Sequence, residues 1–140
     1  MEERKIEERR ILGLFRQCFE DFPKGALKAA ESPDFILHVG PRKKIGLEIT
    51  RLQMESPGES LSMEAIEKCL KAKEEKLPLY RRKRLQEYWL ILVLHDPGHL
   101  PAYNLKNKLS VWRFESGFNR VFLFEPAGGR IYSLRRRSGS

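Results

Sequence analysis

The sequence predicts an α/β fold in which helices flank a central mixed β-sheet. Three observations lead to this prediction: helical and strand patterns alternate along the chain, one run of seven residues is almost wholly apolar, and neither a repeat nor a linker divides the 140 residues. A chain of this length holds one core. We expect one domain over residues 1–134, followed by a basic, flexible tail over residues 135–140.

The first element is predicted to be a helix over residues 3–22. Its apolar residues recur at three- and four-residue steps, the period of one helix face: Ile11, Phe15, Cys18 and Phe22. Pro23 and Gly25 follow and end the helix. Cys18 and Cys69 both fall on apolar positions of helical patterns, so we expect buried thiols in a reducing cytoplasm rather than a zinc site.

Residues 32–52 are predicted to form a β-hairpin whose turn is the segment GPRKK. Strand side chains alternate between faces. One face of the hairpin is therefore apolar: Phe35, Leu37, Val39, Leu47 and Ile49. The opposite face carries Asp34, Ile36, His38, Gly46, Glu48 and Thr50. Gly46 leaves space on that face for another group to approach.

Two acids on the second face of the hairpin are candidate metal ligands. With the turn centred on Arg42, Asp34 lies across from Thr50 and diagonal to Glu48, about 7–8 Å away along the backbone. Hard divalent cations such as Mg²⁺ prefer carboxylate oxygens as ligands. An ordinary solvated strand face is the alternative interpretation of the same pattern.

The second half of the chain is predicted to contain one long helix and three strands. The helix covers residues 62–77, with Ser60 or Ser62 as its N-cap and Pro78 close to its end. The strands are expected at residues 88–94, 119–125 and 130–135. The first of them is apolar almost throughout, which is typical of a strand buried on both faces. Residues 102–112 fit either a short helix or irregular chain.

The segments PDFIL and IGLEIT resemble the motifs of the PD-(D/E)XK nuclease superfamily. Pro33 and Asp34 match the PD, and Glu48 matches the second acid at an ordinary spacing of 14 residues. Members share a helix–hairpin–strand–helix–strand order, so the resemblance implies a restriction-endonuclease-like core over residues 3–95. It also implies phosphodiester hydrolysis with Mg²⁺ or Mn²⁺, held by the two acids and the backbone carbonyl of Ile49.

The chain departs from the superfamily motif at Thr50, where a lysine is usual. That lysine orients or activates the attacking water and stabilises charge on the phosphate, which threonine cannot do. Arg51 is adjacent but points to the opposite face. Lys73 falls inside the apolar stripe of the second helix, and some members of the superfamily carry their lysine on this helix. The alternative is that Lys73 snorkels at the edge of the core.

An acid on the first helix often faces the site in this superfamily. At about 100° per residue, Glu8 falls near the centre of the apolar stripe of that helix, and Glu7 lies nearer its edge. We therefore expect Glu8 in the site, Glu7 as the second choice, and Glu20 in solvent. A surface acid beside a basic neighbour is the alternative for Glu8.

The net charge of +8 and the pI of about 9.7 favour a polyanionic partner. We expect nucleic acid, DNA before RNA, and a homodimer would suit the two strands of a duplex. No segment has the apolar length of a membrane helix or the faces of a membrane-surface helix. Besides residues 135–137, the candidate phosphate contacts are Arg42, Lys43, Lys44, Arg81, Arg82, Lys83 and Arg84.

The sequence therefore predicts a cytoplasmic, metal-dependent nuclease. The alternative is a nucleic-acid-binding or assembly module that kept the fold and lost catalysis, which Thr50 favours. The position of Lys73 separates the two, because a lysine in bulk solvent would leave Asp34 and Glu48 without a cation.

Overall fold

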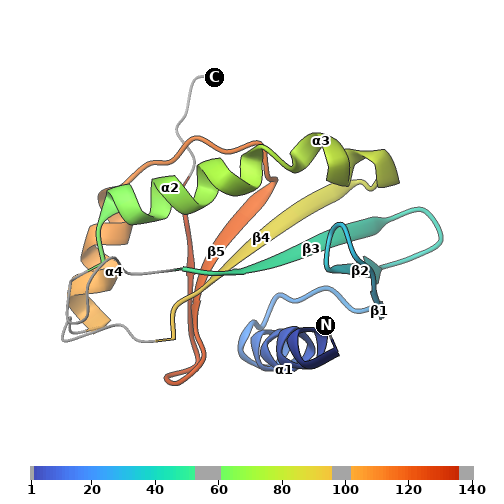
Figure 1. The fold of residues 1–140 in the computed structure, drawn as a ribbon. Coiled ribbons are helices and arrows are strands. Elements are labelled where there is room, and N and C mark those ends of the chain that lie inside the picture. Colours follow the sequence, from blue (N-terminus) through green and yellow to red (C-terminus); the bar gives the residue numbers. More distant parts are fainter. Residues whose placement is uncertain (1, 53–60, 96–101, 136–140) are drawn as a thin grey trace.

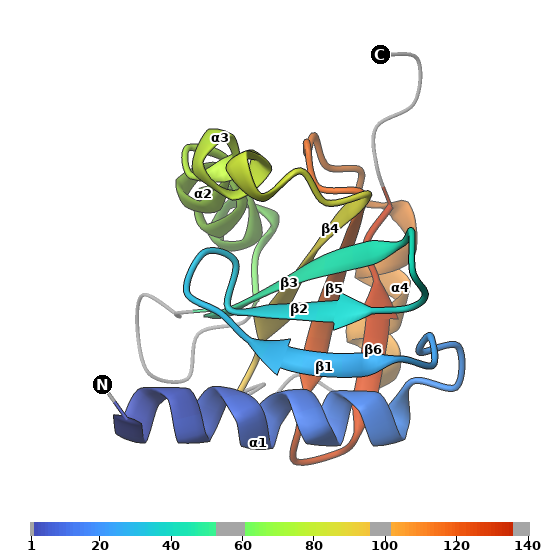
Figure 2. The same ribbon diagram turned by 90° about the vertical axis from the view of Figure 1, so that its right-hand side faces the viewer.

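The computed structural model describes residues 2–52, 61–95 and 102–135, which form three layers (Figures 1 and 2). A six-stranded mixed sheet is the middle layer, and α1 (Glu2–Cys18) covers one of its faces. Three helices cover the other face: α2 (Met63–Glu74), α3 (Leu77–Tyr80) and α4 (Ala102–Val111). The predicted α/β class, with a mixed sheet between helices, is confirmed.

The six strands lie in the sheet in the same order as in the chain. They are β1 (Ala26–Ala29), β2 (Phe35–His38), β3 (Lys44–Arg51), β4 (Glu87–Val93), β5 (Arg120–Glu125) and β6 (Arg130–Ser133). β4 pairs parallel with both β3 and β5, because α2 and α4 cross over between these strands. The remaining neighbours pair antiparallel.

Each face of the sheet has its own apolar core. Leu90 and Ile91 are neighbours in β4, and both are fully buried in different cores, as expected for a strand covered on both faces. The apolar face of the hairpin packs against α1 through Ile11, Leu12 and Phe15. The opposite faces of β4 and β5 pack against α2, α3 and α4.

The structure corrects the prediction for residues 3–29 in three respects. α1 ends at Cys18, after which the chain turns through a hydrogen bond of 3.1 Å from Phe22 N to Phe19 O. Cys18 is exposed rather than buried, because it lies on the last turn beyond the core. β1 was not predicted, because its segment ALKA is mostly exposed and only Leu27 is partly buried.

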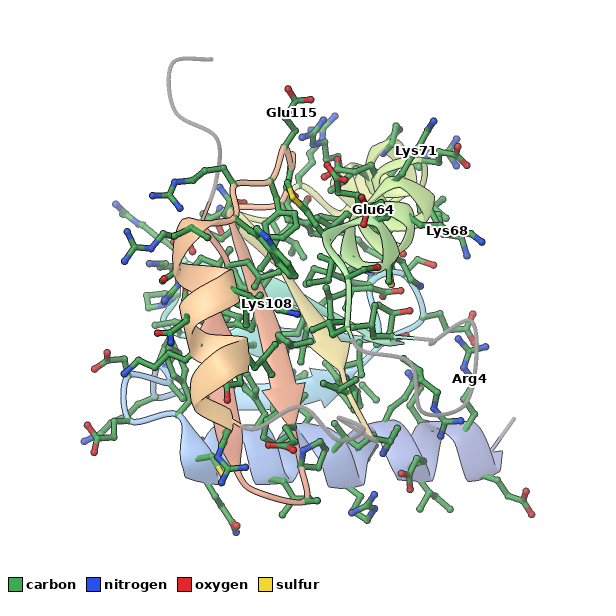
Figure 3. All side chains as sticks on the ribbon, turned by 90° about the vertical axis from the view of Figure 1, so that its left-hand side faces the viewer. Arg4, Glu64, Lys68, Lys71, Lys108 and Glu115 are labelled. Carbon is green, nitrogen blue, oxygen red and sulfur yellow. The ribbon has the colours of Figure 1, made fainter. Side chains whose placement is uncertain are left out.

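The helical layer agrees with the prediction at the start of α2 but differs further along, because α2 ends at Glu74 rather than at Leu77. Ser62 is the N-cap of α2, and its hydroxyl accepts a hydrogen bond from Ala65 N at 3.1 Å. Pro78 does not end a helix but lies in the first turn of α3, where its missing N–H leaves no bond unmade. α2 presents Lys68 and Lys71 away from the sheet (Figure 3). In the part of the chain that the structure describes, no helix combines the length and apolarity needed to cross a bilayer.

Gly46 lies against neighbouring side chains, so the space predicted above it is already filled. A Cβ atom at this position would lie 2.7 Å from Pro33 Cγ, 2.8 Å from Leu85 Cδ1 and 3.2 Å from Tyr88 Cδ1. Pro33 directly precedes the first acid of the hairpin. The missing side chain of Gly46 therefore lets these neighbours pack beside the acid, and it leaves no room for a ligand.

We expect Gly46→Ala to lower the free energy of unfolding by about 1–3 kcal/mol, the usual cost of overpacking a core. Urea denaturation measures this change. Gly13→Ala is the control, because an added Cβ there meets no atom within 4 Å and alanine favours the helix. Equal stability of Gly46→Ala and wild type would mean that Pro33 and Leu85 can move away from the added methyl group without a loss of unfolding free energy.

Candidate active site

Asp34 and Glu48 meet where β2 begins, between two inner strands of the sheet. Phe35 is the partner of Leu47 in the β2–β3 register. Asp34 therefore lies directly opposite Glu48, and the predicted position opposite Thr50 is wrong. The two acids are closer than a diagonal pair would be.

The turn of the hairpin explains the difference in register. Val39 N donates to Lys43 O at 3.0 Å, so the turn centres on Pro41 rather than on Arg42. A shift of one residue in the turn centre moves every partner by two residues. Because side chains alternate with a period of two, each side chain keeps its predicted face.

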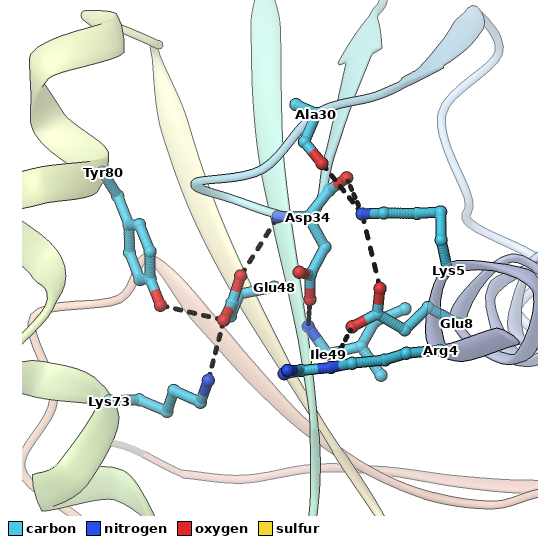
Figure 4. A network of polar contacts seen from close by, with 9 residues as sticks. All are labelled: Arg4, Lys5, Glu8, Ala30, Asp34, Glu48, Ile49, Lys73 and Tyr80. Carbon is cyan, nitrogen blue, oxygen red and sulfur yellow. Dashed lines mark hydrogen bonds and ion pairs between the residues drawn. The ribbon is translucent and has the colours of Figure 1, made fainter. Parts of the chain in front are cut away.

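Backbone amides hold the two carboxylates in place. Asp34 N–H donates to Glu48 Oε1 at 3.1 Å, and Ile49 N–H donates to Asp34 Oδ2 at 2.9 Å (Figure 4). Asp34 is 7% exposed and Glu48 is 5% exposed. Ile49 lies beyond the end of β2, so its N–H and its carbonyl, which share one side of the strand, face the open edge of β3.

Two side chains from the helical layer converge on the second oxygen of Glu48. Lys73 Nζ lies 2.8 Å from Glu48 Oε2, and the Tyr80 hydroxyl donates to the same oxygen at 2.8 Å (Figure 4). The Lys73 side chain is 13% exposed, so it faces the site and not bulk solvent. Thr50 is instead hydrogen-bonded to Cys69, a half-buried thiol of α2.

α1 contributes Glu8 from the opposite face of the sheet. Glu8 is buried, with its Oε1 3.3 Å from Lys5 Nζ and its Oε2 3.6 Å from Arg4 Nε. Lys5 Nζ also donates to the backbone carbonyls of Ala30, at 2.8 Å, and Asp34, at 3.2 Å. Lys5 thereby ties α1 to the segment that leads into β2 (Figure 4).

A cleft of about 240 Å³ opens between α1 and the ends of β3 and β4. Its lining includes Glu7, Glu8, Ile49, Arg51 and His95. Glu7 forms an ion pair of 2.7 Å with Arg10, which lowers the pKa of Glu7, and its side chain is 44% exposed. Of the two predicted α1 acids, Glu8 is therefore the buried one. Arg51 lies on the α1 side of β3, as predicted, and Glu20 is exposed.

The surroundings of the Asp34 carboxyl group oppose its ionisation. Burial raises its pKa to about 7, and the negative charge of Glu48 adds to this effect. The hydrogen bond from Ile49 and the charge of Lys5 act in the opposite direction. Burial and the neighbouring Glu48 also raise the pKa of Tyr80, so its hydroxyl stays a hydrogen-bond donor.

The oxygen atoms around Asp34 are suitable ligands for a hard divalent cation. Glu48 Oε2 already accepts two hydrogen bonds, whereas Oε1 accepts one. Within the described ranges, Ile49 is the one donor to the Asp34 carboxylate. One oxygen of each acid and the Ile49 carbonyl are thus available, and water or phosphate would complete such a site. No group of three or more His, Cys, Asp or Glu residues is placed to hold a metal among the residues described.

The structure brings two of the three basic runs together. Lys44 N donates to Gln86 Oε1 at 2.7 Å, and Gln86 N donates to Lys44 O at 3.0 Å. These bonds join the hairpin turn, with residues 42–44, to the chain that enters β4 after residues 81–84. Of the third run, residues 135–137, only the first lies within the described residues.

Sequence reasoning missed Tyr80 and Lys5. Tyr80 has the pattern of an ordinary core aromatic, and it is indeed buried at 2% exposure, so nothing in the sequence marks its hydroxyl. Lys5 lies among many charged residues. Its spacing of three residues from Glu8, which places both on one face of a helix, was the available signal.

We expect Tyr80→Phe to lower the free energy of unfolding by about 1–3 kcal/mol, because buried Glu48 loses a donor. In a Glu48→Gln background the loss should shrink, and a double-mutant cycle in urea measures the difference. Tyr88→Phe removes a hydroxyl from the same core whose partner is Leu85 N, so its effect should be the same in both backgrounds. Equal losses for Tyr80→Phe in both backgrounds would contradict the contact.

Comparison of the chain with protein-family models, curated proteins and solved structures gave no match. Membership of a family is therefore not shown.

Proposed function

We propose that the protein is a cytoplasmic nuclease with a restriction-endonuclease-like core, which hydrolyses phosphodiester bonds in nucleic acid with Mg²⁺ or Mn²⁺. The observation that supports this most is the 2.8 Å contact between Lys73 and Glu48, which itself lies opposite Asp34. This contact supplies the lysine that Thr50 does not. The order α1, β1, β2, β3, α2, β4 adds support, because it contains the helix, the three strands, the second helix and the fourth strand that the resemblance implies.

Each residue of the site would have a separate chemical role. A cation bound by Asp34, Glu48 and the Ile49 carbonyl would stabilise charge on the phosphate and lower the pKa of a bound water. Lys73 has three N–H donors, of which Glu48 takes one, so two remain for the attacking water or a phosphate oxygen. Tyr80 fixes the orientation of Glu48.

A second candidate function is a nucleic-acid-binding or assembly module without catalysis. Thr50 favours it, and so does the completeness of the polar cluster. Among the described residues, no buried side-chain nitrogen or oxygen lacks a hydrogen-bond partner. With Lys73 and Tyr80 on Glu48, the cluster is satisfied without a cation.

Cleavage assays distinguish the two candidates. Single-stranded, duplex and branched DNA, and RNA, are incubated with wild type, Asp34→Asn or Glu48→Gln, in Mg²⁺, Mn²⁺ or chelator. A nuclease cuts at least one substrate only with a cation, and both variants lose cleavage but keep binding.

Calorimetric titration of Mn²⁺ should give heat with wild type alone. Failure of wild type to cut any substrate would favour the binding module. Light scattering of the DNA complex tests the proposed homodimer.

A further inference from the structure

One end of the molecule carries a dense group of cationic side chains. It lies where the β2–β3 turn and the chain after α3 meet (Figure 1). All of the side chains are exposed, and none forms an ion pair with a described carboxylate. We call this group the basic end: Arg42, Lys44, Arg81, Arg82, Lys83 and Arg84. Lys43, between them, is paired with Glu87 at 3.1 Å.

Arg84 has a backbone conformation that its residue type disfavours. Its φ of 53° and ψ of 49° are left-handed, and among the described residues it is the one non-glycine residue with a positive φ. Glycine adopts this conformation freely, whereas a residue with a Cβ atom costs about 1–2 kcal/mol. An arginine at this position is therefore not explained by the turn itself, and its exposed cationic side chain is the feature that glycine would lack.

The basic end is joined to the candidate site through the chain itself. Tyr80, whose hydroxyl contacts Glu48, is directly followed by Arg81. Along β3, Lys44 and Glu48 are about 13 Å apart at about 3.3 Å per residue. That distance equals about four base pairs along the axis of a duplex, at about 3.4 Å each. One strand can therefore contact the basic end and the carboxylate pair together.

We propose that the basic end binds the phosphate backbone of the nucleic acid whose next few nucleotides reach Asp34 and Glu48. The choice of ligand rests on the proposed function. Unpaired cations on an exposed turn match a polyanion with regularly spaced charges. Lys44 begins the strand that carries Glu48, and Arg81 directly follows Tyr80, which contacts Glu48. Contacts of this kind position the strand and carry no sequence preference.

Fluorescence anisotropy of a labelled 20-base-pair DNA over a range of salt concentrations tests the proposal. Arg82→Ala/Lys83→Ala should weaken binding about tenfold or more at low salt and reduce the salt slope by about two. Arg84→Gly should weaken binding by a smaller factor and yet raise the urea midpoint, because it relieves the left-handed backbone. Lys106→Ala/Lys108→Ala on α4 is the control, with the same loss of charge and little effect.

Unchanged affinity in the basic-end variants, an equal loss in the α4 control, or no DNA binding by wild type at low salt would overturn the proposal. Weaker binding to phosphatidylserine vesicles with unchanged DNA binding would overturn it too. Parallel cleavage assays separate it from the proposed function. If wild type binds DNA through the basic end but cuts nothing, the proposal for the basic end is supported and the nuclease proposal is overturned. If wild type cuts while the basic-end variants bind normally, the nuclease proposal is supported and the proposal for the basic end is overturned.

Discussion

Lys73→Met is expected to lower the rate of phosphodiester cleavage by roughly 10²- to 10⁴-fold, the range for loss of a positioned proton donor or stabilising charge. In the described structure, Lys73 carries the one cationic nitrogen within ion-pair distance of Glu48. Thr50 cannot replace it, because threonine has no charge. DNA affinity should change little, since one charge is lost from a net charge of +8. Cleavage rates and anisotropy measure the two effects separately.

The effect of this substitution on folding needs its own control. Lys73→Met leaves Glu48 buried without a cation, which costs about 3–5 kcal/mol of unfolding free energy. Lys73→Gln keeps an N–H donor, should cost less, and should lose as much cleavage. Lys71→Met is the matched control, because Lys71 lies on the outer side of the same helix (Figure 3). Normal cleavage by both Lys73 variants would assign Lys73 a purely structural role.

Thr50→Lys in the Lys73→Met background is the complementary test. It returns a lysine to the motif position, on the same face of β3 as Glu48. We expect partial recovery of cleavage. The recovery will be incomplete, because Thr50 is hydrogen-bonded to Cys69 and the longer side chain must find space beside α2.

Asp34→Asn is expected to stabilise the protein at neutral and alkaline pH while it removes cleavage and Mn²⁺ binding. Asparagine keeps an oxygen that can accept the hydrogen bond from Ile49 N–H. It removes a buried charge next to Glu48. We expect a gain on the order of 2 kcal/mol at pH 8. A functional carboxylate that lowers stability is typical of active sites, whereas a structural carboxylate would raise it.

The pH dependence of this difference follows from the pKa of Asp34. Its ordinary value is 3.8, and in the folded protein it is about 7. Between these values the folded state holds a proton that the unfolded state has lost, so wild-type stability falls as pH rises through this window. Wild type and Asp34→Asn should therefore have similar stability near pH 4 and diverge up to pH 8. Urea denaturation at pH 4, 6 and 8 measures this, and a constant difference would contradict it.

Cation binding should reverse the sign of this difference. At pH 8, Mn²⁺ should raise the unfolding free energy of wild type by mass action and leave Asp34→Asn unchanged. The same stabilisation of both proteins would place the cation elsewhere.

Much of the fold follows from local pattern, and the failures have local causes. The faces of the hairpin were predictable because alternation survives any even shift in register. The register itself was not, because it depends on the bond from Val39 to Lys43, and the sequence fits a turn centred on Arg42 equally well. β1 escaped prediction because its four residues are mostly exposed, and Leu27 alone cannot create a period.

The candidate site was predictable where a residue type conflicts with its surroundings. Asp34 and Glu48 stand out as acids among strand residues, and Lys73 stands out as a lysine in an apolar stripe. Tyr80 creates no such conflict, because tyrosine is common in protein cores. Its hydroxyl contact depends on where α3 lies relative to β3, which the local pattern does not give. The residues that support a site from a distance in the chain are the ones that pattern cannot reveal.

The shortness of β2 has a consequence for solubility. β2 begins only at Phe35, so within the described ranges no strand pairs with the outer edge of β3 beyond that point. Uncovered strand edges recruit other chains. Here the Asp34 carboxylate takes up the Ile49 N–H, and so occupies a position that the next strand of another molecule would otherwise use. We expect substitutions that cannot accept this hydrogen bond, such as Asp34→Ala, to leave the Ile49 N–H unpaired and to promote self-association.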